Sequence, residues 1–308
     1  MQQTPEVKPR RKPFPTHIIV FLLPATVVYT LFMIYPLIDS LRLSLFATGA
    51  DGTEVFAGVQ NFVKLLTDEL WQPRFWGALK NNFVFFLMHA LVQNTIGLLL
   101  AALLSLRGLR GAGVYRTLLF LPTMLSVVII GFIWQLILSP LWGIAEDLLG
   151  LIGLGQLFGP WLGKESSALI TLSLISVWQW IGIPMMLFYA ALISIPDELI
   201  EAAHVDGATS WGIFWRIKFP LILPTVGMVL ILTYVGNFNA FDRIYTTQGV
   251  LAGPNFSTDI MGTFFYRTFF GQPLQLGTPT RGATIATRRC GSLLIGVLIY
   301  RVGWQRRG

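Results

Sequence analysis

Six long apolar segments constrain the fold of this chain more than any other feature. They cover residues 18–38, 82–106, 117–138, 168–194, 221–241 and 282–300 of the 308-residue sequence. At a rise of roughly 1.5 Å per residue, each segment can cross a hydrocarbon core of roughly 30 Å as a helix. Backbone groups in lipid must satisfy one another, so each segment is expected to be helical. The sequence therefore predicts an all-α membrane protein with six transmembrane helices.

The composition supports this class. Charged residues make up 12% of the sequence and hydrophobic residues 54%, whereas about a quarter of the residues in soluble domains are charged. The net charge of +7 could suggest nucleic-acid binding. The basic residues form no dense patch, however, and many flank the apolar segments as topology signals do. We therefore expect a lipid bilayer, and not a nucleic acid, as the surrounding partner.

Basic residues also predict the orientation. The side with dense bases in tails and short loops is expected to be cytoplasmic; it would hold Lys8, Arg10, Arg11, Lys12, Arg107, Arg110, Arg116, Arg216, Lys218, Arg301, Arg306 and Arg307. This arrangement gives a cytoplasmic basic tail (1–17), a first helix (18–38), an outer loop (39–81), a transmembrane core (82–300) and a cytoplasmic tail (301–308). The first apolar segment is too long for a signal-peptide core and lacks a small-residue cleavage site. Both termini are expected inside.

Proline residues should kink these helices or mark their ends. The ones concerned are Pro24, Pro36, Pro122 and Pro184. Arg288 and Arg289 interrupt the sixth apolar segment, and an arginine at mid-bilayer costs roughly 2.5–3.5 kcal/mol. We favour outward snorkelling of these two side chains, with a channel-facing arginine for an anionic solute as the alternative.

The sequence lacks the motifs that several other functions require. No G-x-x-x-x-G-K-[ST] phosphate loop occurs, and no acidic residue lies within an apolar segment, which disfavours ATP hydrolysis by this chain and ion-coupled secondary transport. Cys290 is the single cysteine, the three histidines are far apart, and no Ser/His/Asp group suggests an intramembrane hydrolase. We therefore expect no metal or cofactor. For His89, Gln93 and Asn94 in the second segment we favour interhelical hydrogen bonding.

Residues 195–220 form a polar, acidic stretch between two apolar segments. Pro196 suits the first turn of a helix, and the acidic residues after it favour the positive helix end. Asp206–Gly207 predicts a turn, because glycine tolerates the left-handed conformation that closes helices. A second short helix would run from Ser210 to Ile217 and stop at Pro220. The expected result is a compact projection held by a membrane helix at each end.

This stretch closely resembles the signature cytoplasmic loop of permease subunits of binding-protein-dependent ABC importers. The matching pattern is Glu-Ala-Ala, three residues, Gly, nine residues, Ile-x-x-Pro, and it comprises Glu201, Ala202, Ala203, Gly207, Ile217 and Pro220. Phe219 stands where leucine is usual. Further likeness, including the segment Gly58-Val59-Gln60-Asn61-Phe62, is closest to the sugar-type branch of the family. The interrupted sixth segment departs from the family's pattern.

The resemblance implies a type I importer permease fold in the bacterial inner membrane, with residues 195–220 as a coupling loop. In the family this loop sits in a cleft of a cytoplasmic ATPase subunit, so Glu201 would contact the ATPase, Ala203 would pack closely and Gly207 would form the turn. Two ATPase subunits, a second homologous permease and an extracytoplasmic solute-binding protein are the implied partners. The implied function is ATP-driven import of a sugar or oligosaccharide; another small polar solute such as glycerol phosphate is the alternative.

A polar solute needs hydrogen-bonding side chains and aromatic faces along its path. Two groups of residues offer them. The first lies in the fifth apolar segment, with Tyr234, Asn237, Phe238 and Asn239, and the second in the fourth segment, with Trp178, Gln179 and Trp180. Neighbouring helical residues point about 100° apart, so only part of each group can face one path.

Overall fold

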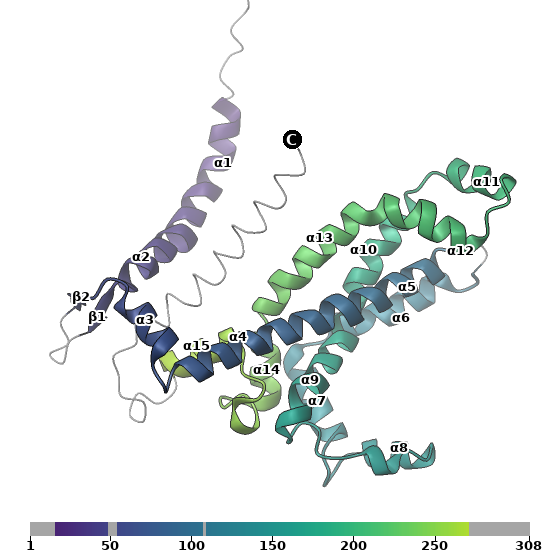
Figure 1. Cartoon of the computed structure of the whole chain (residues 1–308). Helices are drawn as coiled ribbons and strands as arrows, with labels where there is room; N and C mark the ends of the chain where they lie inside the picture. Colours follow the sequence, from purple (N-terminus) through teal and green to yellow (C-terminus); the bar gives the residue numbers. More distant parts are fainter. Residues whose placement is uncertain (1–15, 49–53, 107–108, 271–308) are drawn as a thin grey trace, which may run out of the picture.

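The computed structural model describes residues 16–48, 54–106 and 109–270, which are almost entirely helical (Figure 1). Three helices in this part of the chain are long and apolar enough to cross a membrane, Ile18–Leu43, Gln72–Leu104 and Ser210–Phe238. Two bent helix pairs raise the number to five if each pair makes one span. The prediction of a mostly helical membrane protein is thus confirmed. The sixth predicted helix, with Arg288 and Arg289, lies outside the described residues.

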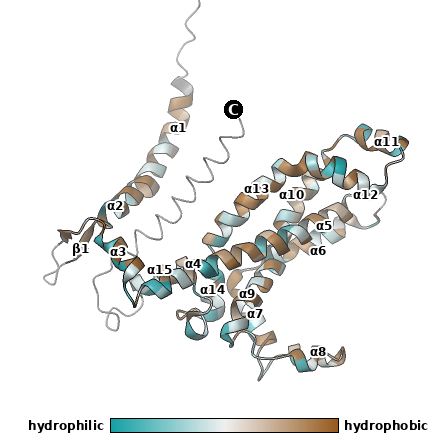
Figure 2. Ribbon diagram, in the orientation of Figure 1, coloured by the Kyte–Doolittle hydropathy of each residue, from teal (hydrophilic) through white to brown (hydrophobic). Residues whose placement is uncertain are grey.

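The first long helix stands apart from the other helices (Figure 1). It consists of α1 (Thr16–Tyr29), a π-helical turn η1 (Thr30–Ile34) and α2 (Tyr35–Leu43). The helix continues through Pro36 because the π turn before it pairs the Tyr35 N–H with the Thr30 carbonyl, a spacing that accommodates a missing donor. Its end at Leu43, and not at Ile38, corrects the predicted boundary. Its residues are largely apolar (Figure 2). Most of their side chains are exposed.

Residues 39–81, predicted as an outer loop, are mostly regular structure. Strands β1 (Phe46–Thr48) and β2 (Glu54–Phe56) form an antiparallel hairpin, followed by α3 (Gln60–Thr67) and the start of α4. Asn61 fixes α3 to the hairpin because its amide donates to the Ser44 and Phe46 carbonyls, each at 2.9 Å. Leu65 of α3 is buried in an apolar cluster with Trp71 and Phe264, so both hydrogen bonds and packing order this segment.

The second long helix begins at Gln72 and not at Asn82. It comprises α4 (Gln72–Leu87), a π turn η2 (Met88–Gln93) and α5 (Asn94–Leu104). Its first turns are polar, which is why hydropathy misses them. Asn81 lies there, and its amide donates to the carbonyls of Ser257 (3.0 Å) and Asp259 (2.9 Å). The polar turns therefore bind a distant loop of the same chain.

The third predicted helix, 117–138, is not one straight span. Helix α6 (Ala112–Phe120) and a 3₁₀ turn η3 (Leu121–Met124) meet α7 (Val127–Ile137) at 95°. The 3₁₀ turn contains Pro122, and the two residues after it, Leu125 and Ser126, have extended ψ angles of 145° and 134° that interrupt the helix. Beyond α7, the short helices α8 (Ala145–Leu151) and η4 (Gly155–Leu157) follow.

The fourth predicted helix is bent by 46° between α9 (Glu165–Trp180) and α10 (Gly182–Ile193). Pro184 lies just after the bend and lacks the N–H that would continue the ladder, as predicted. Gly182 allows α10 to approach α6, because a Cβ at this position would lie 2.8 Å from the Phe120 Cα. The bend thus packs α10 against the end of α6.

Seven further elements follow α10 in the described part of the chain. They are α11 (Asp197–Val205), α12 (Ser210–Ile213), a π turn η5 (Phe214–Lys218), α13 (Phe219–Phe238), α14 (Phe241–Gln248), a 3₁₀ turn η6 (Pro254–Phe256) and α15 (Met261–Phe270). Helix α13 ends at Phe238 and not at Phe241. Two further helices, α14 and α15, thus lie between the fifth and sixth apolar segments.

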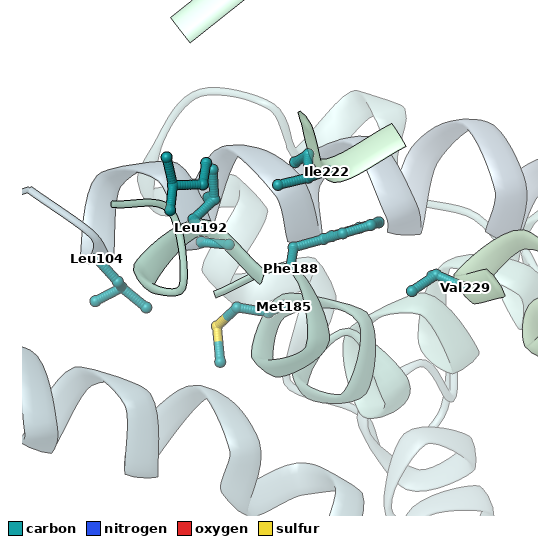
Figure 3. Packing of buried hydrophobic residues seen from close by; sticks show 8 residues of the cluster. Leu104, Met185, Phe188, Leu192, Ile222 and Val229 are labelled. Atoms are coloured by element: carbon teal, nitrogen blue, oxygen red, sulfur yellow. The ribbon is translucent and has the colours of Figure 1, made fainter. Parts of the chain in front are cut away.

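Helices α5, α10 and α13 form the largest apolar core. Met185, Phe188 and Leu192 of α10 pack between Leu104 of α5 and Ile222 and Val229 of α13 (Figure 3). Gly97 lets α5 approach α10, since a Cβ there would lie 3.3 Å from the Met185 nitrogen. This core carries α11 and α12 at one end of the bundle, far from α8 (Figure 1).

Candidate coupling loop and translocation path

The turn of loop 195–220 has the geometry of a Schellman motif. Gly207 has φ of +78°, the Ala208 N–H donates to the Ala203 carbonyl at 2.9 Å, and the Gly207 N–H donates to the His204 carbonyl at 3.0 Å. These bonds close α11 and satisfy its last carbonyls. The left-handed turn predicted at Gly207 is therefore present.

Thr209, two residues after Gly207, caps the start of α12. The Thr209 hydroxyl accepts a hydrogen bond from the Gly212 N–H at 3.2 Å, as an N-cap does. Ala203 of α11 and Ile213 of α12 are buried, whereas Glu201 and Ala202 are exposed. The loop is thus a folded projection whose inner residues pack and whose outer residues face away.

Pro220 does not stop the second helix. The helix is continuous from Ser210 to Phe238, because the π turn at Phe214–Lys218 pairs the Phe219 N–H with the Phe214 carbonyl just before the proline. Ile217 and Pro220 therefore lie within one helix that passes from the loop into α13. This continuity joins the projection stiffly to the bundle.

Large apolar side chains are exposed on the loop. Leu199 is 47% exposed, Val205 89% and Trp211 69%. Trp211 and Trp215 form a T-shaped pair with centroids 5.6 Å apart, and both line an open hollow with Gly207. Sequence reasoning did not single out these tryptophans, although their spacing of four residues places them on one helix face. Such a surface is typical of an interaction site.

The candidate path residues of α13 point in different directions. Asn237 is 2% exposed, and its backbone carbonyl accepts a bond from the Asn82 amide at 3.2 Å. Its Oδ1 and the Tyr234 hydroxyl are buried without a hydrogen-bond partner in the described part of the chain. Asn239 is exposed and caps its own helix by donating to the Val235 carbonyl. Of the candidate path residues in α13, Tyr234 and Asn237 thus offer interior polar atoms, whereas Asn239 does not.

The two candidate path residues in α9, Trp178 and Gln179, also differ in exposure. Trp178 is 44% exposed and packs edge-on against Trp134, whereas Gln179 is buried and donates to the Leu125 carbonyl at 3.2 Å. The expected interhelical bonding is confirmed for His89, whose Nε2 lies 2.9 Å from the Ser176 hydroxyl. It is also confirmed for Asn94, which donates to the Thr233 hydroxyl at 3.2 Å. Polar contacts thus join α9 and α13 to the second long helix.

Arg243 is a candidate that sequence reasoning missed. Its guanidinium lies 4.8 Å from the centroid of the Trp180 ring. It lines a small cavity with Ser176, Gln179 and Thr247. The only available signal was a basic residue just beyond the fifth apolar segment, which is equally typical of topology.

A buried ion pair lies near the start of α15. Arg267 contacts Asp259 at 2.5 Å, and Thr263 donates to the same carboxylate. Burial raises the pKa of Asp259 above its ordinary value, and the hydrogen bond from Arg267 opposes that shift. The pair anchors α15 beneath the loop that carries Ser257.

Comparison with known proteins identifies the family. Residues 93–302 match the family model described as binding-protein-dependent transport system inner membrane component. The chain belongs to this family. It is therefore a multi-pass membrane permease of an ABC transporter, and the family is not catalytic.

Two curated relatives resemble the permease over most of their length. A probable ABC transporter permease protein, YurN of Bacillus subtilis, is 34% identical and covers 86% of this chain and 89% of its own. The lactose transport system permease protein LacF of Rhizobium radiobacter is 34% identical and covers 82% of each chain. A solved bacterial ABC transporter involved in alginate import has a TM-score of 0.76 at 24% identity, covering 95% of the permease and 96% of that chain. The structural match shows a shared fold.

Proposed function

We propose that this permease translocates a sugar or oligosaccharide, driven by ATP that separate ATPase subunits hydrolyse. The observation that carries the proposal is the closed geometry of loop 195–220. Its Schellman turn and N-cap form a stiff projection, and the unbroken helix from Ser210 to Phe238 can transmit a push on that projection into the bundle. Glu201, Ala202, Ala203 and Gly207 would form the ATPase contact, with Ile217 and Pro220 in the transmitting helix.

The proposed assembly contains two ATPase subunits, a second homologous permease and an extracytoplasmic solute-binding protein. The family's dependence on a binding protein supports the last. The exposed apolar residues Leu199 and Val205 support a protein partner at the loop. The exposed first helix, Ile18–Leu43, supports contact with a second permease subunit, since few of its side chains pack within this chain.

The topology follows from the same proposal. The full permease would have six spans of the type I importer fold, with both termini and loop 195–220 in the cytoplasm of the bacterial cell. The basic residues Arg216 and Lys218 at the loop support this orientation.

A carbohydrate substrate is supported by the interior side chains and by a relative. Tyr234 and Asn237 leave polar atoms without partners inside the bundle, and Gln179 lines the small cavity. An amide group can hydrogen-bond to a sugar hydroxyl, and an aromatic ring can stack on a sugar ring. LacF is a permease of a lactose transport system, and lactose is a carbohydrate.

A matched pair of glycine variants tests the coupling role. Gly207→Ala and Gly153→Ala place a Cβ at φ of +78° and +77°, respectively, and neither Cβ meets an atom within 4 Å. The backbone strain is therefore similar, roughly 1–2 kcal/mol. Gly153 follows α8 in the chain, and α8 lies away from α11 and α12 of the loop (Figure 1). In the reconstituted importer we expect Gly207→Ala to reduce ATPase docking and ATP-dependent uptake several-fold, and Gly153→Ala to change neither. Equal effects of the two variants would overturn the coupling role.

A further inference from the structure

Arg243 carries a positive charge into the bundle, and the adjacent Asp242 is the acidic group that acts on it. The guanidinium packs on the Trp180 ring, and among the described residues it forms no ion pair, whereas Arg267 pairs with Asp259. The neighbouring Asp242 is exposed. Arginine stays protonated at neutral pH. The partly buried charge is therefore offset only by an exposed carboxylate that solvent screens, so an anionic partner on its buried side would stabilise it further.

A small cavity beside Arg243 collects further polar groups. Its volume is about 10 Å³, and Ser176, Gln179 and Thr247 line it together with apolar side chains of α7 and α9. That space holds about one water molecule. The described conformation is thus closed to a sugar at this point, and a solute group could enter only when α7, α9 and α14 separate.

A second unused donor lies next to the charge. The indole Nε1 of Trp180 is buried, and in the described part of the chain it has no hydrogen-bond partner. Arg243 covers the face of the same indole. The guanidinium and the indole N–H are both donors only, and a charge-assisted bond is stronger than a neutral one, so together they favour an anionic acceptor over a neutral hydroxyl.

We infer that Arg243 and Trp180 form a specificity-determining position for an anionic saccharide, one that carries a carboxylate or phosphate group. This inference rests on the proposed transport function and narrows its substrate class. When the bundle opens, the anionic group enters between α9 and α14 and accepts hydrogen bonds from the guanidinium. The indole N–H supplies a further donor, and the ring remains a flat support for the arginine. Gln179 lines the same cavity as Arg243.

Thiol modification in the cavity tests this position. The complete importer is reconstituted with Cys290→Ser and Thr247→Cys, and two methanethiosulfonate reagents of similar size are compared during ATP turnover. One reagent carries a sulfonate and the other a trimethylammonium group. We expect the anionic reagent to react about tenfold faster relative to the cationic one. That preference should vanish in Arg243→Gln and persist in Arg243→Lys, because a purely structural arginine–indole contact would be altered in both variants.

Adding sugars during the thiol modification distinguishes a carboxylate from a phosphate as the anionic group that binds. Glucuronate and glucose 6-phosphate should each slow the modification, and glucose should not. Equal rates for the two reagents, no reaction with either, or protection by glucose alone would overturn the inference. ATP-dependent uptake by the same importer with the unaltered chain is measured in parallel. If the two reagents react equally while ATP-dependent uptake is intact, only this inference is wrong. If uptake occurs without the ATPase subunits, the proposed function is wrong, and the preference between the reagents can still be measured.

Discussion

The Oδ1 atom of Asn82 accepts a hydrogen bond from the Met261 N–H at 2.8 Å, and the Asn82 amide donates to the Asn237 carbonyl. One buried side chain thus joins α4, the start of α15 and the end of α13. These three helices meet where the path residues Tyr234 and Asn237 lie. The position of the proposed path therefore depends on polar contacts as well as on the apolar core.

Replacing Asn82 should loosen this junction. Asn82→Leu leaves the Met261 N–H and the Asn237 carbonyl buried without partners, at a cost of about 2–3 kcal/mol in the free energy of unfolding. Thermal unfolding of the purified permease in detergent measures the loss. Asn239→Leu is the control, because that amide is exposed. Equal unfolding temperatures for the two variants would contradict the joining role.

Close helix contacts predict different costs for two glycine substitutions. Gly182→Ala brings a Cβ within 2.8 Å of the Phe120 backbone, whereas a Cβ at Gly227 in α13 meets nothing within 4 Å. The first variant should lose about 1–3 kcal/mol through overpacking. The second should be neutral or stabilised by up to about 1 kcal/mol through helix propensity. Chemical denaturation in one detergent compares them, and a Gly182→Ala protein of unaltered stability would refute the close packing of α6 and α10.

The Arg267–Asp259 pair predicts a pH effect. Arg267→Met leaves the carboxylate buried without its partner and should cost about 3–5 kcal/mol at pH 8. The folded-state pKa of Asp259 is raised by burial and should rise further in the variant. A raised folded pKa means that the folded state binds the proton more tightly, so stability increases as pH falls through that pKa. Unfolding temperatures at pH 5 and pH 8 test this: the deficit should shrink at pH 5. A deficit independent of pH would contradict it.

The exposed apolar surface of loop 195–220 predicts a binding defect without a folding defect. Val205→Asp alters a side chain that is 89% exposed, so the stability of the isolated permease should change by less than about 0.5 kcal/mol. Co-purification with the ATPase should fall at least tenfold, because a charge would be buried at the interface. Leu151→Asp in α8, where the leucine is 83% exposed, is the matched control. If both variants co-purify normally, Val205 is no part of the docking surface.

Sequence reasoning located the apolar segments and the turn at Gly207, because both follow from local patterns. It failed where tertiary contacts decide the structure. The polar turn at Asn81 continues a helix because the side chain binds the backbone of Ser257 and Asp259, far along the chain. Pro220 reads as a helix stop in sequence, yet a π turn supplies the bond that lets the helix continue. Arg243 reads as a topology signal because nothing local reveals Trp180 beneath it.

Vesicle reconstitution tests the central proposal, that a stiff loop transmits work from an ATPase to this bundle, most directly. Uptake of a radiolabelled oligosaccharide is measured with the complete importer, with the ATPase subunits omitted, and with the permease chain alone. We predict uptake only for the complete importer supplied with ATP, and a several-fold loss in Gly207→Ala that Gly153→Ala does not share. Solute entry through the chain alone, without nucleotide, would contradict the proposal.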